Sequence, residues 1–146
     1  MDTTDLGSHL YFAYGSNLDP EQMEFRCAGA IPAGIGRLEG WRLRIGERGV
    51  ATVTESPAAV VWGGLWEVSD EHLRALDRAE GVAAGLYRRE VVRIAGGDEA
   101  LDAVVYIEAF TADGPPRPGY LERILRGAEW FALPADYRAT LADLAR

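Results

Sequence analysis

The chain has 146 residues, of which 48% are hydrophobic and 26% are charged, a size and composition typical of one globular domain with an ordinary core. Its formal net charge of −8 at pH 7 argues against a nucleic-acid partner, because nucleic acids are bound through clusters of Lys and Arg. Cys27 is the only cysteine, which excludes an internal disulfide and a thiolate metal cluster and favours a reducing compartment.

The N-terminal sequence has no basic region followed by a long apolar run, and no window holds the roughly 18 apolar residues of a membrane helix. We therefore expect a cytoplasmic protein without a membrane partner. Residues 1–8 are polar and predict a flexible N-terminal segment, and residues 9–146 predict a single domain without internal repeats.

The first predicted element is a strand over 9–14, which runs into a Gly-Ser-Asn turn. A short helix is predicted next, with Asp19 as N-cap, Pro20 at the first helical position and Gln22 completing a capping box. The backbone N–H groups of Gly15–Leu18 would then lie in a tight turn before a helix, where they can bind a carboxylate or an oxyanion. The alternative is an ordinary structural turn, since most such junctions bind nothing.

Several better-known sites are excluded by residue type. The turn has no Lys-Ser/Thr pair of a phosphate P-loop and no G-x-G-x-x-G of a dinucleotide site. Ser16 is not framed as G-x-S-x-G, and the two histidines, His9 and His72, do not suggest a catalytic triad. Ser16 is therefore expected to be a turn residue and not a nucleophile.

The middle of the chain predicts a meander of strands followed by a helix. The predicted strands are Trp41–Ile45, Val50–Thr54 and Val60–Val68, with a turn at Glu55-Ser56-Pro57. The helix begins after Ser69, carries Leu73 and Leu76 on one face and ends at Gly81.

The last third predicts two more strands and two helices. The strands, over 87–94 and 100–109, are joined by a hairpin turn at 96–98. One helix places Tyr120, Ile124 and Ala128 on one face, and a last helix begins at Pro134 and carries Tyr137, Leu141 and Leu144. Together the elements predict an α+β fold, with a curved or barrel-like mixed β-sheet and short helices.

Glu80 stands at an unfavourable place for an acid. It lies in the last turn of the predicted middle helix, where it faces the negative end of the helix dipole. If the side chain is also buried, both effects raise its pKa above the usual value of about 4.3, toward one suited to proton transfer near neutral pH. Glu80 is thus a candidate general base, the alternative being a solvated helix end, and Asp77 one turn earlier is expected at the surface or as a cap partner.

Taken in order, the motifs resemble the γ-glutamylcyclotransferase family. The segments that carry the resemblance are 11–18 (YFAYGSNL), 62–68 (WGGLWEV), 76–81 (LDRAEG), 85–87 (GLY), 119–120 with 127–128, and 133–137 (LPADY). Each motif is short, but the ordered set is specific and extends over nearly all of residues 10–144.

The resemblance implies an enzyme of the acyltransferase or lyase type. It closes the γ-glutamyl group of a small-molecule amide into 5-oxoproline and releases an amine or an amino acid, as in glutathione metabolism, with no metal and no organic cofactor. The family's catalytic glutamate corresponds to Glu80. The expected substrate-binding residues are Tyr14, Gly15, Ser16, Asn17, Leu18, Tyr87, Tyr106 and Tyr120. We expect a monomer or a homodimer.

The chemistry suits these residue types. The α-ammonium group of the substrate must lose a proton before its nitrogen attacks the γ-carbonyl, and a glutamate of raised pKa can accept that proton and later protonate the departing nitrogen. The loop amides are expected to face the γ-carbonyl oxygen, with the α-carboxylate as the alternative.

Three questions stay open from the sequence. The chain is either active or a catalytically silent module that binds small metabolites, although binding alone would not need Glu80. The same reaction on a γ-glutamylamine or a γ-glutamyl-protected biosynthetic intermediate is a further alternative. Arg88 and Arg89, which follow Tyr87, either select a leaving group that has a free carboxylate or are solvated charges on a strand. The sequence also lacks a longer C-terminal extension seen in some relatives.

Overall fold

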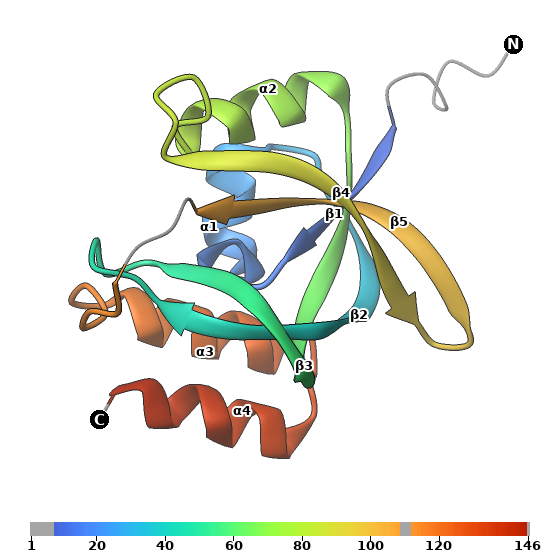
Figure 1. Ribbon diagram of the computed structural model, residues 1–146. Coiled ribbons are helices and arrows are strands. Elements are labelled where there is room, and N and C mark those ends of the chain that lie inside the picture. The colour runs from blue at the N-terminus through green and yellow to red at the C-terminus, as the bar shows by residue number, and fades with distance from the viewer. Residues whose placement is uncertain (1–7, 109–111, 146) are drawn as a thin grey trace, which may run out of the picture.

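The centre of the molecule is a closed barrel of five strands (Figure 1). The structure is a computed structural model, which describes residues 8–108 and 112–145. The strands are β1 (His9–Ala13), β2 (Ile31–Ile45), β3 (Ala51–Val68), β4 (Tyr87–Gly96) and β5 (Glu99–Glu108). Their order around the barrel is β1-β3-β2-β4-β5, and β1 closes it by pairing in parallel with β5, whereas the other pairs are antiparallel. The predicted α+β fold with a mixed, barrel-like sheet is therefore confirmed.

Short helices surround the barrel. They are η2 (Ser16–Leu18), α1 (Pro20–Arg26), α2 (Asp70–Ala79), α3 (Tyr120–Trp130), α4 (Ala135–Ala142) and η3 (Asp143–Ala145). In Figure 1, α3 and α4 lie side by side below the barrel and α2 lies above it. None of these helices, all within the described ranges, has the length and apolar character needed to cross a membrane.

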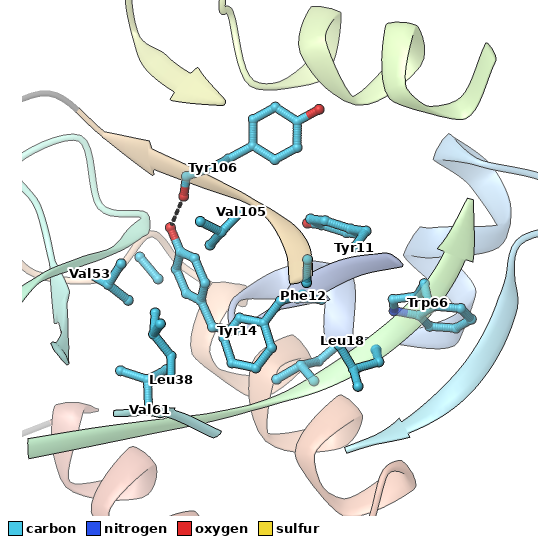
Figure 2. Close-up of a cluster of buried hydrophobic side chains, with 14 of the residues drawn as sticks. Tyr11, Phe12, Tyr14, Leu18, Leu38, Val53, Val61, Trp66, Val105 and Tyr106 are labelled. Carbon is cyan, nitrogen blue, oxygen red and sulfur yellow. Dashed lines mark hydrogen bonds between the residues drawn. The ribbon is translucent and has the colours of Figure 1, made fainter. Parts of the chain in front are cut away.

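The core fills the barrel with apolar side chains. Phe12, Val53, Val61 and Val105 are among the fully buried ones. Figure 2 shows this cluster together with tyrosine rings, and the dashed line marks the bond that the Tyr14 hydroxyl donates to the backbone of the β5 strand. One end of the core is therefore built from side chains that are apolar along their length and polar at the tip.

The middle strands differ from the prediction. β2 and β3 form one long antiparallel hairpin, and the turn predicted at 55–57 lies within β3, so that prediction is wrong. Glu39 pairs with Val60 and Trp41 with Glu55, so several residues of β3 bulge out opposite a single residue of β2. A bulge accommodates Pro57, which has no N–H for the sheet, without reversing the chain.

Local side-chain chemistry sets the ends of α2 as predicted. The Ser69 hydroxyl accepts a bond from His72 N–H, and His72 Nδ1 accepts one from Ser69 N–H. Gly81 has φ +66, a left-handed conformation that favours glycine and ends the helix one residue after Glu80. The hairpin predicted at 96–98 is also present between β4 and β5.

Two predictions extend beyond the part of the chain that the structure describes. Residues 1–7 of the expected N-terminal segment lie outside the described residues. Ala109, expected as the last residue of the strand over 100–109, lies outside them as well.

The contact between α3 and the turn before α1 yields a stability prediction. A Cβ atom at Gly127 would overlap the backbone of Leu18 and Asp19. Gly127→Ala should therefore destabilise the protein by about 1–3 kcal/mol through overpacking, although the same change in an open helix would stabilise it by roughly 1 kcal/mol. Urea unfolding measures the difference.

The matched control for this change is Glu129→Ala, at an exposed position of the same helix. It should change the free energy of unfolding by no more than about 0.5 kcal/mol. A stabilising effect of Gly127→Ala would contradict the close packing of α3 on this turn.

Candidate active site

One cavity of about 280 Å³ brings together residues from distant parts of the sequence. It is lined by the turn after β1, by the end of α2 and by the first residue of α3. Of the predicted site residues, those that line it are Tyr14, Gly15, Ser16, Asn17, Glu80, Tyr87, Tyr106 and Tyr120. Leu18 is the exception.

Leu18 belongs to the core and not to the cavity. Its side chain is fully buried, and its N–H donates to Gly15 O at 3.0 Å. Asp19 N–H donates in the same way to Ser16 O at 3.0 Å, so the turn forms a 3₁₀ helix that uses two of its own amides. Of the four amides predicted to face a ligand, that of Leu18 is therefore already used, and the backbone of Ser16 also bonds to the Tyr120 hydroxyl.

The side chain of Asn17 organises this turn. It is buried, and its Nδ2 donates to the Tyr11 hydroxyl at 2.9 Å. Its Oδ1 accepts from Gln22 Nε2 at 2.9 Å and from Arg26 Nη1 at 3.1 Å. All of these partners also line the cavity, so Asn17 fixes the wall more than it offers free polar atoms to a ligand.

Gln22 has a different role from the predicted one. Asp19 does cap α1, since its carboxylate accepts from Glu21 N–H at 3.2 Å. The Gln22 amide, however, turns to Ser16 Oγ at 2.5 Å and to Asn17 instead of closing a capping box. The prediction was wrong because the preceding turn offers acceptors that local spacing rules do not consider.

Glu80 lies close to this turn. It is the residue after α2, and its side chain is 20% exposed. Arg26 Nη1 lies 3.9 Å from Glu80 Oε1 and 3.1 Å from Asn17 Oδ1, so those two oxygens are at most 7.0 Å apart. The turn and the carboxyl group can therefore contact the same small molecule.

The environment of Glu80 raises the pKa of its carboxyl group. Burial is the largest cause, because it disfavours the charged form. The charges of Arg26 and Arg48 act in the opposite direction, and the nearby Glu108 carboxylate adds to the increase. Glu80 is thus an acid whose pKa is shifted toward neutrality, in a pocket open to solvent, which suits proton exchange.

Three of the four predicted tyrosines use their hydroxyl protons on the protein. Tyr14 donates to Tyr106 O at 2.6 Å, and Tyr87 donates to Ala51 O at 2.7 Å. Tyr106 donates to Asp77 Oδ1 at 2.7 Å. These residues present rings to the cavity, and burial raises the pKa of each phenol well above its usual value.

Tyr120 differs from the other three. Its hydroxyl oxygen accepts from Ala51 N–H at 2.9 Å, and a Cβ atom at Gly15 would lie 3.1 Å from it. Burial raises the pKa of Tyr120 to about 12, so the phenol keeps its proton at neutral pH. Within residues 8–108 and 112–145, that proton is not committed to a backbone carbonyl, and it can be donated to a group beside Ser16.

The sequence reasoning missed three arginines of the cavity, Arg26, Arg48 and Arg117. Arg26 could have been found from the sequence, because it follows the Gly15–Leu18 segment by two turns of helix. Arg48 and Arg117 come from loops that are 69 residues apart and are joined by a bond from Arg117 Nε to Arg48 O at 2.8 Å. No local sequence pattern predicts that these two arginines lie together.

Arg88 and Arg89 do not line this cavity. Arg88 Nε pairs with Glu90 at 2.9 Å and Arg89 Nη1 pairs with Asp77 at 2.9 Å, and both arginine side chains are exposed to solvent. The solvated-charge interpretation of these two arginines fits their positions. Asp77 proves to be a partner of Arg89 and Tyr106 and not a cap.

The described residues offer no cluster of three or more His, Cys, Asp or Glu side chains that could hold a metal ion. Cys27 is buried with its Sγ against the backbone of His72 in α2, and burial raises the pKa of its thiol to about 11. It therefore stays protonated at neutral pH.

Comparison with known proteins gives a consistent picture. Residues 60–141 match the AIG2-like family. The human protein named γ-glutamylcyclotransferase is 33% identical, over 94% of this chain and 79% of its own length, and the bovine one is 33% identical over 99% and 82%. A solved structure named γ-glutamyl cyclotransferase superposes with a TM-score of 0.88 at 32% identity and covers 92% of this chain and 86% of that one.

The raised pKa of Glu80 predicts a pH-dependent effect on stability. A carboxyl group whose pKa rises on folding stabilises the protein most below its unfolded-state pKa, and this contribution is lost as the pH rises through the folded-state pKa. Gln cannot ionise, so the Tm of Glu80→Gln should exceed that of wild type only slightly at about pH 4. The difference in Tm should be larger at about pH 8. Thermal unfolding across this range measures the difference, and a constant or reversed difference would contradict the shift.

Proposed function

Because the chain belongs to the γ-glutamylcyclotransferase family, we propose that it cyclises the γ-glutamyl group of a small-molecule amide to 5-oxoproline and releases an amine or an amino acid. Its family relatives are enzymes, and the chain is an enzyme of this type. The observation that carries the detailed proposal is the pairing of a carboxyl group of raised pKa with a hydrogen-bonding turn in one small cavity.

The first step is a proton transfer. The α-ammonium group of the substrate gives a proton to the ionised carboxylate of Glu80, and its nitrogen becomes a nucleophile. A free α-amino group has a pKa near 8, so a Glu80 of raised pKa narrows the gap that this transfer must overcome. The same carboxylate therefore selects a cationic group and activates it.

Ring closure follows within the substrate. The nitrogen attacks the γ-carbonyl carbon and forms a five-membered ring with a tetrahedral oxyanion, and the collapse of this intermediate breaks the bond to the leaving nitrogen. Protonated Glu80 supplies the proton that this nitrogen needs. The protein acts mainly by holding the α-nitrogen of the substrate close to its γ-carbonyl carbon. Because both groups belong to one molecule, this orientation lowers the activation barrier substantially.

The oxyanion needs donors during this step. We assign this role to the amides of the turn at Gly15–Asn17 together with the Tyr120 hydroxyl, which lies beside that turn. Tyr14, Tyr87 and Tyr106 would then contact the substrate through their rings, since their hydroxyls donate to the protein. The guanidinium of Arg26 remains beside Glu80 to stabilise its charged form.

Glu80→Gln is the main test of this mechanism. Gln keeps the shape of the side chain but cannot accept a proton, and general acid–base catalysis is typically worth about 10²–10⁴-fold. The release of 5-oxoproline from a panel of γ-glutamyl compounds should therefore fall by at least about 100-fold, with the fold retained. The matched control is Glu71→Gln, an isosteric change at an exposed position of α2, which should leave turnover unchanged.

Two outcomes would overturn the proposal. Glu80→Gln that keeps more than about a tenth of the wild-type kcat would remove Glu80 from the mechanism. Wild-type protein that binds γ-glutamyl compounds and turns over none of them would indicate a binding module.

Tyr120→Phe tests the hydroxyl assigned to the oxyanion. Loss of one neutral hydrogen bond is worth about 0.5–1.5 kcal/mol, so kcat/KM should fall about 2- to 12-fold. The companion variant is Tyr106→Phe, because the Tyr106 hydroxyl is bonded to Asp77. This variant should lower the free energy of unfolding and leave kcat/KM nearly unchanged. The assignment fails if Tyr120→Phe changes stability alone.

A further inference from the structure

The cavity is positively charged although the chain as a whole is acidic. Arg26, Arg48 and Arg117 line it, and Glu80 is the single acidic residue among the described lining residues, whereas the chain carries a formal net charge of −8. The proposed reaction uses the Glu80 carboxylate, the guanidinium of Arg26 beside it and a set of hydrogen-bond donors, but it gives no role to Arg48 and Arg117. The excess of cations indicates a substrate with more than one anionic group.

Arg26 is already engaged within the site. Its Nη1 contacts Asn17 and lies near the Glu80 carboxylate. Arg48 contacts neither of these two groups. It comes from the turn between β2 and β3, stands over the ring of Tyr87 at 5.4 Å from the ring centre, and is about one-third exposed. It is therefore the arginine placed to contact a ligand that lies against Tyr87.

Glu108 holds Arg48 in this position. Its Oε2 accepts from Arg48 Nε at 2.8 Å and from Arg48 Nη2 at 2.5 Å. Only 4% of the Glu108 side chain is exposed, and its Oε1 has no hydrogen-bond partner among the residues that the structure describes. Burying a carboxylate with one oxygen unsatisfied costs free energy, so stability alone does not account for this ion pair, and orientation of Arg48 does.

The anchoring leaves one edge of the guanidinium available. A guanidinium has five N–H donors, and Arg48 uses its Nε and Nη2 atoms to bind Glu108. One proton of Nη1 and the second proton of Nη2 form the other edge, which has the spacing for two parallel bonds to a carboxylate. Arg117, which is bonded to the backbone of Arg48, places a second positive charge next to it.

We propose that Arg48, positioned by Glu108, is a specificity-determining residue that binds a carboxylate on the leaving group and so favours γ-glutamyl amino acids over γ-glutamylamines. The proposal rests on the function proposed above. It assigns the glutamyl half of the substrate to Glu80 and the turn, and the leaving group to the side of the cavity formed by Tyr87 and Arg48. The carboxylate of the leaving amino acid then binds to Arg48.

A matched pair of substrates isolates this interaction. γ-Glutamylalanine and γ-glutamylethylamine differ by the one carboxylate in question, and their glutamyl halves are identical. The measured quantity is the ratio of their kcat/KM values for 5-oxoproline release. Any effect of Arg48 on Glu80, or on the glutamyl half, acts on both substrates and cancels in this ratio.

Wild-type protein should prefer γ-glutamylalanine, and Arg48→Gln should reduce the preference about 10- to 100-fold, as expected for the loss of charge-assisted hydrogen bonds. Arg48→Lys, which keeps the charge but not the forked geometry, should retain part of it. The control is Arg88→Gln, an arginine paired with Glu90 outside the cavity, which should leave the ratio unchanged. An unchanged ratio in Arg48→Gln would overturn the proposal.

Arg48→Gln leaves Glu108 as a buried carboxylate without a counter-ion, which can destabilise the fold. The second variant is therefore Arg48→Gln with Glu108→Gln, in which both charges are removed together. It should show the same reduced ratio with a Tm close to that of wild type. Glu108→Gln alone keeps the Arg48 charge but loosens its orientation, and should reduce the ratio by less than Arg48→Gln does.

Failure of the proposed function would be seen separately, as an absence of 5-oxoproline from both substrates. Binding then tests the role of Arg48 directly, by calorimetric titration of both compounds into Glu80→Gln protein with and without Arg48→Gln. Tighter binding of γ-glutamylalanine that depends on Arg48 supports the assignment. Equal binding of the two compounds, or a difference that survives Arg48→Gln, contradicts it.

Discussion

Partial burial of the Glu80 carboxyl group is the constraint on which the site depends. An acid at the end of a helix is held in a cavity where desolvation raises the pKa of its carboxyl group, while the charges of Arg26 and Arg48 act in the opposite direction. The balance matters because a fully stabilised carboxylate would be too weak a base, and a permanently neutral one could accept no proton. Arg26 also bonds to Asn17, so one guanidinium joins the Glu80 carboxyl group to the turn at Gly15–Asn17.

Helix α3 holds the turn after β1 in place. The turn after β1 is fixed from behind by α3, which packs so closely at Gly127 that a methyl group would not fit. Asp19, almost fully buried, caps α1 and accepts bonds from Arg123 and Arg126 of α3 at 2.9 and 2.7 Å. The turn is thus tied to elements more than 100 residues away in sequence, and its amides cannot rearrange without disturbing the core.

The structure also shows how far the sequence could be interpreted. The end of α2 at Gly81 and the hairpin between β4 and β5 depend on local chemistry and were predicted correctly, as was the mixed, barrel-like fold. The continuity of β3 through Pro57 was missed because a bulge depends on the partner strand. Arg48 was missed for a similar reason, since its partner Glu108 is 60 residues away. The roles assigned to Glu80 and the other site residues in catalysis and binding stay predictions.

The most direct test of the account is the pKa of Glu80 itself, measured by NMR titration of its side-chain carboxyl carbon in the free protein. The account predicts a value above the ordinary glutamate value of about 4.3, equal to the pKa on the acidic side of the pH profile of kcat/KM. Activity should rise with pH as this group ionises. A pKa at or below the ordinary value, or an acidic limb that does not coincide with the Glu80 titration, would contradict the claim that this carboxyl group carries the proton.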